Sequence, residues 1–505
     1  MSKEPEKMDR RNYVKYVATG VAGLAVGAAA GYLGAGGGAP APPGQVMTVT
    51  ETRTVTQTAA APTPAGFEPE GSFTIATLGG PRHEMALRAV AERYMKAFPK
   101  VKIDFELGTW DSHFAKMAVE LAAGTGKYPV FTQDPEMFNA PWVVSGYLEP
   151  LGKYMTGTQL EDVHEDAPAF ALEHLWQSST PHKTDPPSGH YYGLPIDSNA
   201  QLFWYRKSVL EEAGWSKPPD TIQEFFECCK AIHNPPKMYA AAYNMLRFWA
   251  AEAYLSLTFT QGTHFWPGAP WMVAGKPRFD TEPFIRSAEI IRDLYKYCPP
   301  EALTWTEMEC ATAVGTTGNV AMAPYGWGLP VYTDPKLSPL ADDIGIGARD
   351  GPVLKDEVTG GRASALGGFS FAMDAHAPEK LKPTLWHFMW NVMSREYMSY
   401  SPYTYTTNTG QPGRISALSL DYAKMGLVAQ RYYGPLAEAM KIAGIRPHVP
   451  AWKDIHEMLG IRLGEIAQGR DVKEGMRKLN DETIAVLNKY DYPWGLKNLP
   501  ASQGP

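Results

Sequence analysis

The stretch at residues 72–110, SFTIATLGGPRHEMALRAVAERYMKAFPKVKIDFELGTW, decides the fold class. Its first seven residues form a short β-branched run, which is typical of a strand. The segment that follows repeats apolar residues at helical spacing, and a second strand pattern begins at Val101. The inward face of the predicted helix consists of Leu87, Val90, Ala91, Tyr94 and Phe98. Strand, helix and strand at this spacing predict a parallel sheet covered by helices, and hence an α/β protein.

The same alternation continues toward residue 151. A second helix pattern, with Phe114, Met117 and Leu121 inward, leads to the strand pattern YPVFTQD at 128–134. Ligands of parallel α/β sheets bind beyond the carboxyl ends of the strands. These ends predict four ligand-contacting residues: Trp110, Asp111, Gln133 and Asp134. The alternative is structural, with Trp110 capping the core and Asp111 serving as the N-cap of the helix that begins near Ser112.

The N-terminal 70 residues do not follow this alternation. The pair Arg10-Arg11 precedes an uncharged run of small residues, so residues 1–35 are predicted to be an export signal or a membrane anchor. The paired arginines resemble a twin-arginine export signal. Residues 36–70 are rich in Thr, Pro and Gly and cannot bury enough apolar area to fold, which predicts a linker. We therefore expect an extracytoplasmic protein at a prokaryotic cell surface, archaeal by preference, tethered by this segment or secreted after its cleavage.

Length, charge and cysteine content narrow the function classes. At 505 residues the chain is too long for one hydrophobic core, so two domains are expected. The net charge is -7 and no basic block follows the N-terminus, which argues against a nucleic-acid partner. The cysteines form no CxxC pair and no histidine cluster accompanies them, so no metal site is predicted. Cys228 and Cys229 fit a buried helix face, and a disulfide between Cys298 and Cys310 is left open.

Seven phrases in a fixed order resemble one known family. They extend over roughly residues 72–490 and read AFPKVKIDFE, LAAGTGKYPVFTQD, SGYLEPLGKYM, YYGLPIDSNAQLFWYRKSVLEEAGWSKPPDTIQEF, TTGNVAMAPYGWGLP, ASALGGFSFAMDAHAPEKLKPTLWHFMWNVMSREY and RPHVPAWKDIHEMLGIRLGEIAQGRDVKEGMRKLNDE. In this order they resemble the extracellular solute-binding proteins of ABC importers, of the carbohydrate-uptake, maltose-binding-protein-like type.

The resemblance implies a two-lobed periplasmic-binding-protein-like fold of type II, with the ligand held in a cleft between the lobes. It implies a discontinuous chain path, in which lobe one takes residues 72–197 and 365–412 and lobe two takes 200–345 and 413–495. It further implies a monomer without a cofactor, which closes on a sugar or oligosaccharide and delivers it to ABC permease subunits in the membrane. Relatives of this family also bind glycerol phosphates, peptides or polyamines, so a non-sugar solute is the alternative.

Further ligand contacts are predicted where this resemblance and local composition agree. Asn199 and Trp327 match positions at which the family often touches its ligand. Asn199 belongs to the polar island Asp197-Ser198-Asn199, which we expect to be the first crossing between the lobes and a hinge; the alternative is a plain turn. The remaining candidates are Gly368, Phe369, Tyr403, Tyr405, Arg414 and Trp452.

An enzyme is the rival class. The segment Gly368-Phe369-Ser370-Phe371-Ala372 imitates the G-x-S-x-G elbow of hydrolases, but it ends in Ala and a β pattern continues through it. Glu307 and Glu309 could form a carboxylate pair, yet a solvated helix face explains their spacing more simply. We therefore expect no catalytic residues, and a secreted hydrolase is the less favoured alternative.

Overall fold

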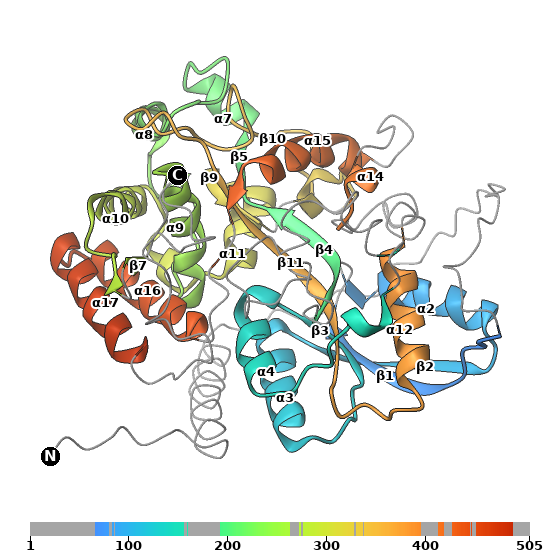
Figure 1. Cartoon of the computed structure of the whole chain (residues 1–505). Coiled ribbons are helices and arrows are strands. Elements are labelled where there is room, and N and C mark those ends of the chain that lie inside the picture. Colours follow the sequence, from blue (N-terminus) through green and yellow to red (C-terminus); the bar gives the residue numbers. More distant parts are fainter. Residues whose placement is uncertain are drawn as a thin grey trace, which may run out of the picture.

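The chain folds around two separate sheets with helices packed on both (Figure 1). The computed structural model describes residues 66–79, 83–84, 86–155, 159, 192–262, 272–273, 276–327, 330–336, 338–394, 413–418, 427–444, 446 and 451–487. Outside these residues lie the predicted export signal at 1–35, the predicted linker up to residue 65, and the candidates Tyr403 and Tyr405. In the described part of the chain, no helix is long and apolar enough to cross a bilayer.

The first sheet has the strand order β12-β11-β3-β1-β2, with β4 paired to β11. Its strands are β1 (Gly71–Leu78), β2 (Val101–Gly108), β3 (Val130–Gln133), β4 (Leu194–Ala200), β11 (Ser364–Met373) and β12 (Ala443–Gly444). β1 pairs in parallel with both β2 and β3, which confirms the predicted parallel sheet. β11 then runs antiparallel to β3 and to β4.

Helices cover both faces of the first sheet (Figure 1), and the bounds of the main ones are α2 (Ala86–Ala97), α3 (Trp110–Ala123), α4 (Ala140–Val144) and α12 (Lys382–Met393). Phe73 of β1 packs in one core cluster with Tyr94 of α2, whereas Ala76 packs in another with Phe114 of α3. This alternation along β1 gives each face its own core. The predicted inward residues are buried at Leu87, Ala91, Tyr94, Phe114, Met117 and Leu121, and half-buried at Val90 and Phe98.

The second sheet has the strand order β10-β5-β9-β6, and a separate hairpin lies apart from it. The strands are β5 (Leu202–Arg206), β6 (Tyr239–Ala241), β9 (Val320–Gly326) and β10 (Ile344–Ile346), and the hairpin is β7 (Met272–Val273) with β8 (Lys276–Pro277). The further helices are α7 (Lys207–Glu212), α8 (Ile222–Ile232), α9 (Phe248–Thr260), α10 (Glu282–Tyr295), α11 (Glu307–Thr312), α14 (Ile415–Leu418), α15 (Leu427–Lys441), α16 (Trp452–Ala467) and α17 (Val472–Leu487).

The chain passes from the first sheet to the second at Gln201, because β4 ends at Ala200 and β5 begins at Leu202. The polar island before it lies inside β4, where Asp197, Ser198 and Asn199 are buried and paired with residues of β11. The alternative of a plain turn is therefore wrong. Pairing with β11 keeps the island extended, so its backbone does not turn back on itself.

A buried polar node joins this crossing to the start of β11. Ser256 of α9 donates its hydroxyl to Gln201 Oε1 and accepts a hydrogen bond of 2.7 Å from the backbone N–H of Ala365. Gln201 N donates to the carbonyl of Ala365 at 3.1 Å, and Ser364 Oγ donates to the carbonyl of Gln201 at 2.7 Å. All four residues are fully buried. The two strands that meet here are therefore tied to each other and to α9.

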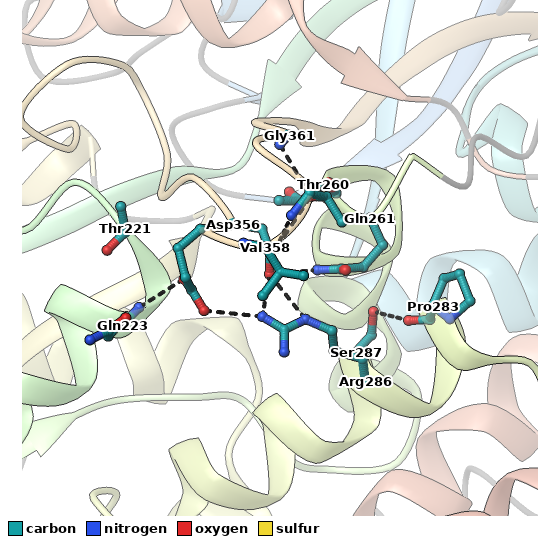
Figure 2. Close-up of polar contacts among 12 residues, drawn as sticks. Thr221, Gln223, Thr260, Gln261, Pro283, Arg286, Ser287, Asp356, Val358 and Gly361 are labelled. Carbon is teal, nitrogen blue, oxygen red and sulfur yellow. Dashed lines mark hydrogen bonds and ion pairs between the residues drawn. The ribbon is translucent and has the colours of Figure 1, made fainter.

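The loop before β11 is anchored by Asp356, as Figure 2 shows. Its Oδ2 accepts from Gln261 Nε2 at 2.9 Å and from Arg286 Nη2 at 2.8 Å. Its Oδ1 accepts from the backbone N–H groups of Val358 at 2.9 Å and Thr359 at 2.8 Å. One fully buried carboxylate thus joins this loop to the end of α9 and to α10.

All four cysteines are free and buried. The disulfide left open between Cys298 and Cys310 is not formed, and Cys298 Sγ lies 3.5 Å from the carbonyl of Leu294 on the preceding helix. Cys228 and Cys229 are buried on α8, as predicted. Burial raises the pKa of the Cys228 thiol to about 12, so this group stays protonated and apolar in character.

Candidate functional site

Trp110 is the first residue of α3, directly after β2 and its N-cap Thr109. Thr109 Oγ1 accepts from the backbone N–H of Ser112 at 3.3 Å, so the proposal that Asp111 is the N-cap is wrong. Asp111 lies exposed in the first turn of the helix. The Trp110 ring packs at 5.0 Å from Phe114 on its own helix and at 5.0 Å from Phe248 of α9. It therefore reaches across to the helices around the second sheet.

Asp134 follows β3 and caps the short helical turn η2 (Pro135–Asn139). Its Oδ1 accepts from Met137 N at 3.3 Å, and its carboxylate also accepts a hydrogen bond from the Trp110 side chain. Burial raises the pKa of Asp134 to about 6, although Arg446 and these two hydrogen bonds act to lower it. Two of the predicted contacts, Trp110 and Asp134, are thus in direct contact.

Asn199 and Trp327 meet at Gly367. Trp327 follows β9, is 7% exposed and has its ring beside β11. A Cβ on Gly367 would lie 2.5 Å from Asn199 Oδ1 and 3.1 Å from two ring carbons of Trp327. Only a glycine fits between these side chains without moving one of them. The structure therefore brings together two candidates that are 128 residues apart in the sequence, since 327 minus 199 is 128.

Four ionisable side chains, here named the buried ion cluster, lie next to these candidates: Glu136, Glu252, Arg446 and His456. The guanidinium of Arg446 pairs with Glu136 of η2 and with Glu252 of α9. His456 Nε2, from α16, lies 3.0 Å from Glu252 Oε1. Arg446 Cζ lies 5.8 Å from the ring centre of Trp327. The cluster thus connects η2, which follows a strand of the first sheet, to helices packed around the second.

Burial sets the protonation states in the buried ion cluster. It lowers the pKa of His456 well below the ordinary value, so this imidazole is neutral at pH 7. It also lowers the pKa of Arg446 to about 10, which leaves the guanidinium charged at pH 7. Burial, with added repulsion from Asp134 and Glu307, raises the pKa of Glu252 well above its ordinary value.

The sequence reasoning missed all four members of this cluster. One signal was available for Glu252, because Glu252, Ser256 and Thr260 recur every four residues in an otherwise apolar helix pattern. Such a polar stripe in a buried helix predicts fixed polar partners. A lone arginine such as Arg446 carries no comparable signal.

The remaining candidates fall in three places. Trp452 is fully buried at the start of α16, with its ring 5.7 Å from His456, so it joins the cluster. Gly368 and Phe369 lie in β11 opposite the polar island, and Gln133 at the end of β3 donates to the carbonyl of Tyr192 at 3.4 Å. Arg414 is fully buried and donates to the carbonyl of Met393 at the end of α12.

The two enzyme-like patterns lie in ordinary secondary structure. Gly368 to Ala372 is continuous strand within β11, without the strand-to-helix turn of a nucleophile elbow. Glu309 completes a capping box with Thr306 at the start of α11, which confirms the helix that its spacing predicted.

Comparisons with known proteins agree on one family. The family described as bacterial extracellular solute-binding protein matches residues 80–384. A binding protein of Brucella abortus (strain 2308) is 29% identical over 141 residues, which are 26% of this chain. The chain spans only 29% of the length of that curated relative.

Solved structures agree with the predicted fold. The maltose-bound MalE3 of T. maritima has a TM-score of 0.68 at 16% identity, over 82% of this chain and 98% of that one. The GacH receptor of Streptomyces glaucescens has a TM-score of 0.67 at 18% identity, over 84% and 100%. A solute-binding protein of Agrobacterium radiobacter, in complex with ribitol, has a TM-score of 0.66 at 19% identity, over 83% and 100%. These likenesses confirm the two-lobed α/β fold.

Proposed function

The chain belongs to the bacterial extracellular solute-binding proteins, and from that premise we propose that it is the receptor of an ABC importer that captures a sugar or oligosaccharide. The observation that carries this proposal is the gathering of Trp110, Asp134, Asn199, Trp327 and Trp452 around the buried ion cluster. A sugar presents apolar faces and polar edges. Flat aromatic rings next to carboxylates and an amide match that pattern.

The proposed mechanism is closure of the two lobes on the solute. Trp110 and Asp134 follow strands of the first sheet, whereas Trp327 follows a strand of the second. A ligand that contacts both sets favours the closed state, because only that state makes all of the contacts. A shift from about 1:99 to 99:1 needs about 5.5 kcal/mol of differential binding. Stacking on two aromatic rings together with several hydrogen bonds can supply that amount.

The wider role follows from the same premise. The receptor works outside the cytoplasm as a monomer, tethered by its N-terminal segment or secreted, and passes the solute to permease subunits. We also retain the predicted division into lobes, residues 72–197 with 365–412 and 200–345 with 413–495. No catalytic step belongs to this proposal.

A thermal-melting screen of the purified protein against mono- and oligosaccharides tests the proposal. We expect the melting temperature to rise with the concentration of one class of sugar, since stabilisation reaches about 2.7 kcal/mol at a hundredfold excess over Kd. Mass spectrometry of a solute retained on purification supplies an independent identification. A shift with polyamines or peptides alone would instead establish the non-sugar alternative, and turnover of a glycoside would establish the hydrolase.

A further inference from the structure

Among the described residues, the buried carboxylates in and next to the buried ion cluster outnumber the buried cations there. Three carboxylates, Asp134, Glu136 and Glu252, are each less than a tenth exposed, and they share one buried guanidinium, that of Arg446. Arg446 forms its ion pairs with the two glutamates. His456 adds no positive charge because burial keeps it neutral.

Asp134 is the carboxylate left without a counter-charge of its own. Within the described residues it forms no ion pair shorter than 4.0 Å, and it accepts hydrogen bonds from Met137 N and the Trp110 side chain. The other cation nearby, Lys453, is half-buried and interacts with two further acids, Asp111 and Glu457. A buried carboxylate in this situation is stabilised by a cation or by further donors.

Two side chains of the same cluster also have polar atoms without a hydrogen-bond partner in the described part of the chain. Arg446 Nε and His456 Nδ1 are buried and have no hydrogen-bond partner among the described residues. Both side chains are more than nine-tenths buried, and both are held within the cluster by their contacts with Glu252. The first atom is a donor and the second can accept in the neutral ring, so hydroxyl groups, which both donate and accept, suit the two positions.

The aromatic rings at the site favour a positive charge as well. The guanidinium of Arg446 already lies 5.8 Å from the ring centre of Trp327, so one cation is held beside an indole face here. The Trp110 side chain donates a hydrogen bond to Asp134, so a second indole lies next to the carboxylate that has no ion pair of its own.

We propose that the captured solute carries a protonated amino group on a hydroxyl-bearing scaffold, as an amino sugar does, and that Asp134 receives this group. The proposal rests on the proposed function and adds the chemical class of the ligand. The ammonium supplies the missing counter-charge through a charge-assisted hydrogen bond, while hydroxyls of the same ligand satisfy Arg446 Nε and His456 Nδ1. A neutral sugar would leave Asp134 with no positive charge other than that of Arg446, which also pairs with Glu136 and Glu252. A simple polyamine would leave Arg446 Nε and His456 Nδ1 unmatched.

Isothermal titration calorimetry with a matched panel tests this assignment. The panel contains amino sugars, their N-acetyl derivatives and their neutral parents, each from the monosaccharide to the tetrasaccharide, together with spermidine. We expect the free amine to bind roughly tenfold to a hundredfold more tightly than its neutral parent, in line with one hydrogen bond to a charged group. Equal or tighter binding of the neutral or N-acetyl sugars overturns the amine assignment while the proposed sugar receptor stands. Binding of spermidine alone, or of no saccharide, overturns both.

A variant separates the charge of Asp134 from its role as a cap. Asp134→Asn keeps the size and capping ability of the side chain, because Asn also caps helices well. We expect it to lose the preference for the amine by at least tenfold while the neutral parent binds as before. The control is Asp104→Asn, which removes an exposed carboxylate from β2 and should leave the preference intact. An unchanged amine preference in Asp134→Asn overturns the proposed role of Asp134.

Discussion

Gly367 is the residue against which two predicted ligand contacts rest. A Cβ at this position would lie 2.5 Å from Asn199 Oδ1 and 3.1 Å from the Trp327 ring. Because the glycine lies in the middle of β11, the strand gives the new methyl group no room to move away.

Gly367→Ala should therefore displace the two contacts without removing either side chain. We expect ligand affinity to fall at least tenfold by calorimetry, with a cost in stability of about 1–3 kcal/mol from overpacking. Gly464→Ala in α16 is the matched control, since nothing lies within 4 Å of its Cβ position and affinity should not change. Unchanged affinity in Gly367→Ala would mean that neither Asn199 nor Trp327 touches the ligand.

The sequence predicted some residues of the candidate site and missed others for physical reasons. Trp110 and Asp134 were recognised because each lies just beyond a strand pattern, and the carboxyl ends of strands are where ligands gather. Trp327 was recognised because it matches a position at which the resembled family often touches its ligand. Arg446 was missed because its partners, Glu136 and Glu252, are 310 and 194 residues away (446 minus 136 and 446 minus 252). Only the folded chain brings these charged side chains together, so no local sequence pattern predicts the cluster.

At the scale of elements, α9 carries a polar stripe through an otherwise apolar environment. The stripe consists of Glu252, Ser256 and Thr260, which lie four residues apart on one face. Glu252 pairs with Arg446, and Ser256 donates to Gln201 at the crossing between the sheets. Thr260 donates to the carbonyl of Ala363, the residue before β11. The helix thus connects the buried ion cluster to the point where the chain passes between the sheets.

Ser256→Ala removes the hydroxyl that joins Gln201 to Ala365. We expect a loss of about 1–3 kcal/mol in the free energy of unfolding, because buried groups lose their partner. Hydrogen exchange at the Ala365 amide should also accelerate, since this N–H donates to Ser256 Oγ. The control is Ser287→Ala, whose hydroxyl is equally buried but donates to Pro283 O on its own helix (Figure 2). Unchanged exchange at Ala365 would contradict a role for Ser256 in fixing the crossing.

The Asp356 anchor predicts acid sensitivity of the loop before β11. Burial acts to raise the pKa of Asp356, but the hydrogen bonds from Gln261 and Thr359 and the pair with Arg286 outweigh it, so the pKa lies below its ordinary value. The stabilisation is therefore present above about pH 4, the unfolded value, and is lost as the pH falls through the lowered folded value. In urea unfolding, Asp356→Asn should be less stable than the wild type at pH 7 and converge with it below pH 4. A difference that does not change with pH would contradict this.

Periodicity predicted the elements better than their connections. The alternation of strands and helices from residue 72 correctly gave the parallel strands β1, β2 and β3. The return of β11, antiparallel between β3 and β4, joins segments more than 150 residues apart and leaves no trace in local spacing. The polar island in β4 was open to interpretation as a turn for the same reason, because the strand that pairs with it lies far along the chain.

At the scale of the whole molecule, Arg446 bridges the two sets of elements that the ligand is proposed to join. Its guanidinium pairs with Glu136, which follows a strand of the first sheet, and with Glu252 of α9, which packs around the second (Figure 1). In the proposed mechanism, this bridge favours closure of the lobes before any solute binds, so a solute has to provide less differential binding energy.

Arg446→Met should therefore open the ligand-free protein. The substitution keeps much of the side-chain volume but leaves two buried carboxylates facing each other without a cation, so separating the lobes relieves their repulsion and lets water reach them. We expect the radius of gyration from small-angle X-ray scattering to be larger than in the wild type, with the circular dichroism spectrum of a folded protein retained. Lys441→Met, which removes an exposed pair with Glu438 on α15, is the control and should scatter as the wild type does. Identical scattering from Arg446→Met and the wild type would show that the guanidinium does not hold the lobes together, and the closed state would then depend on the solute alone.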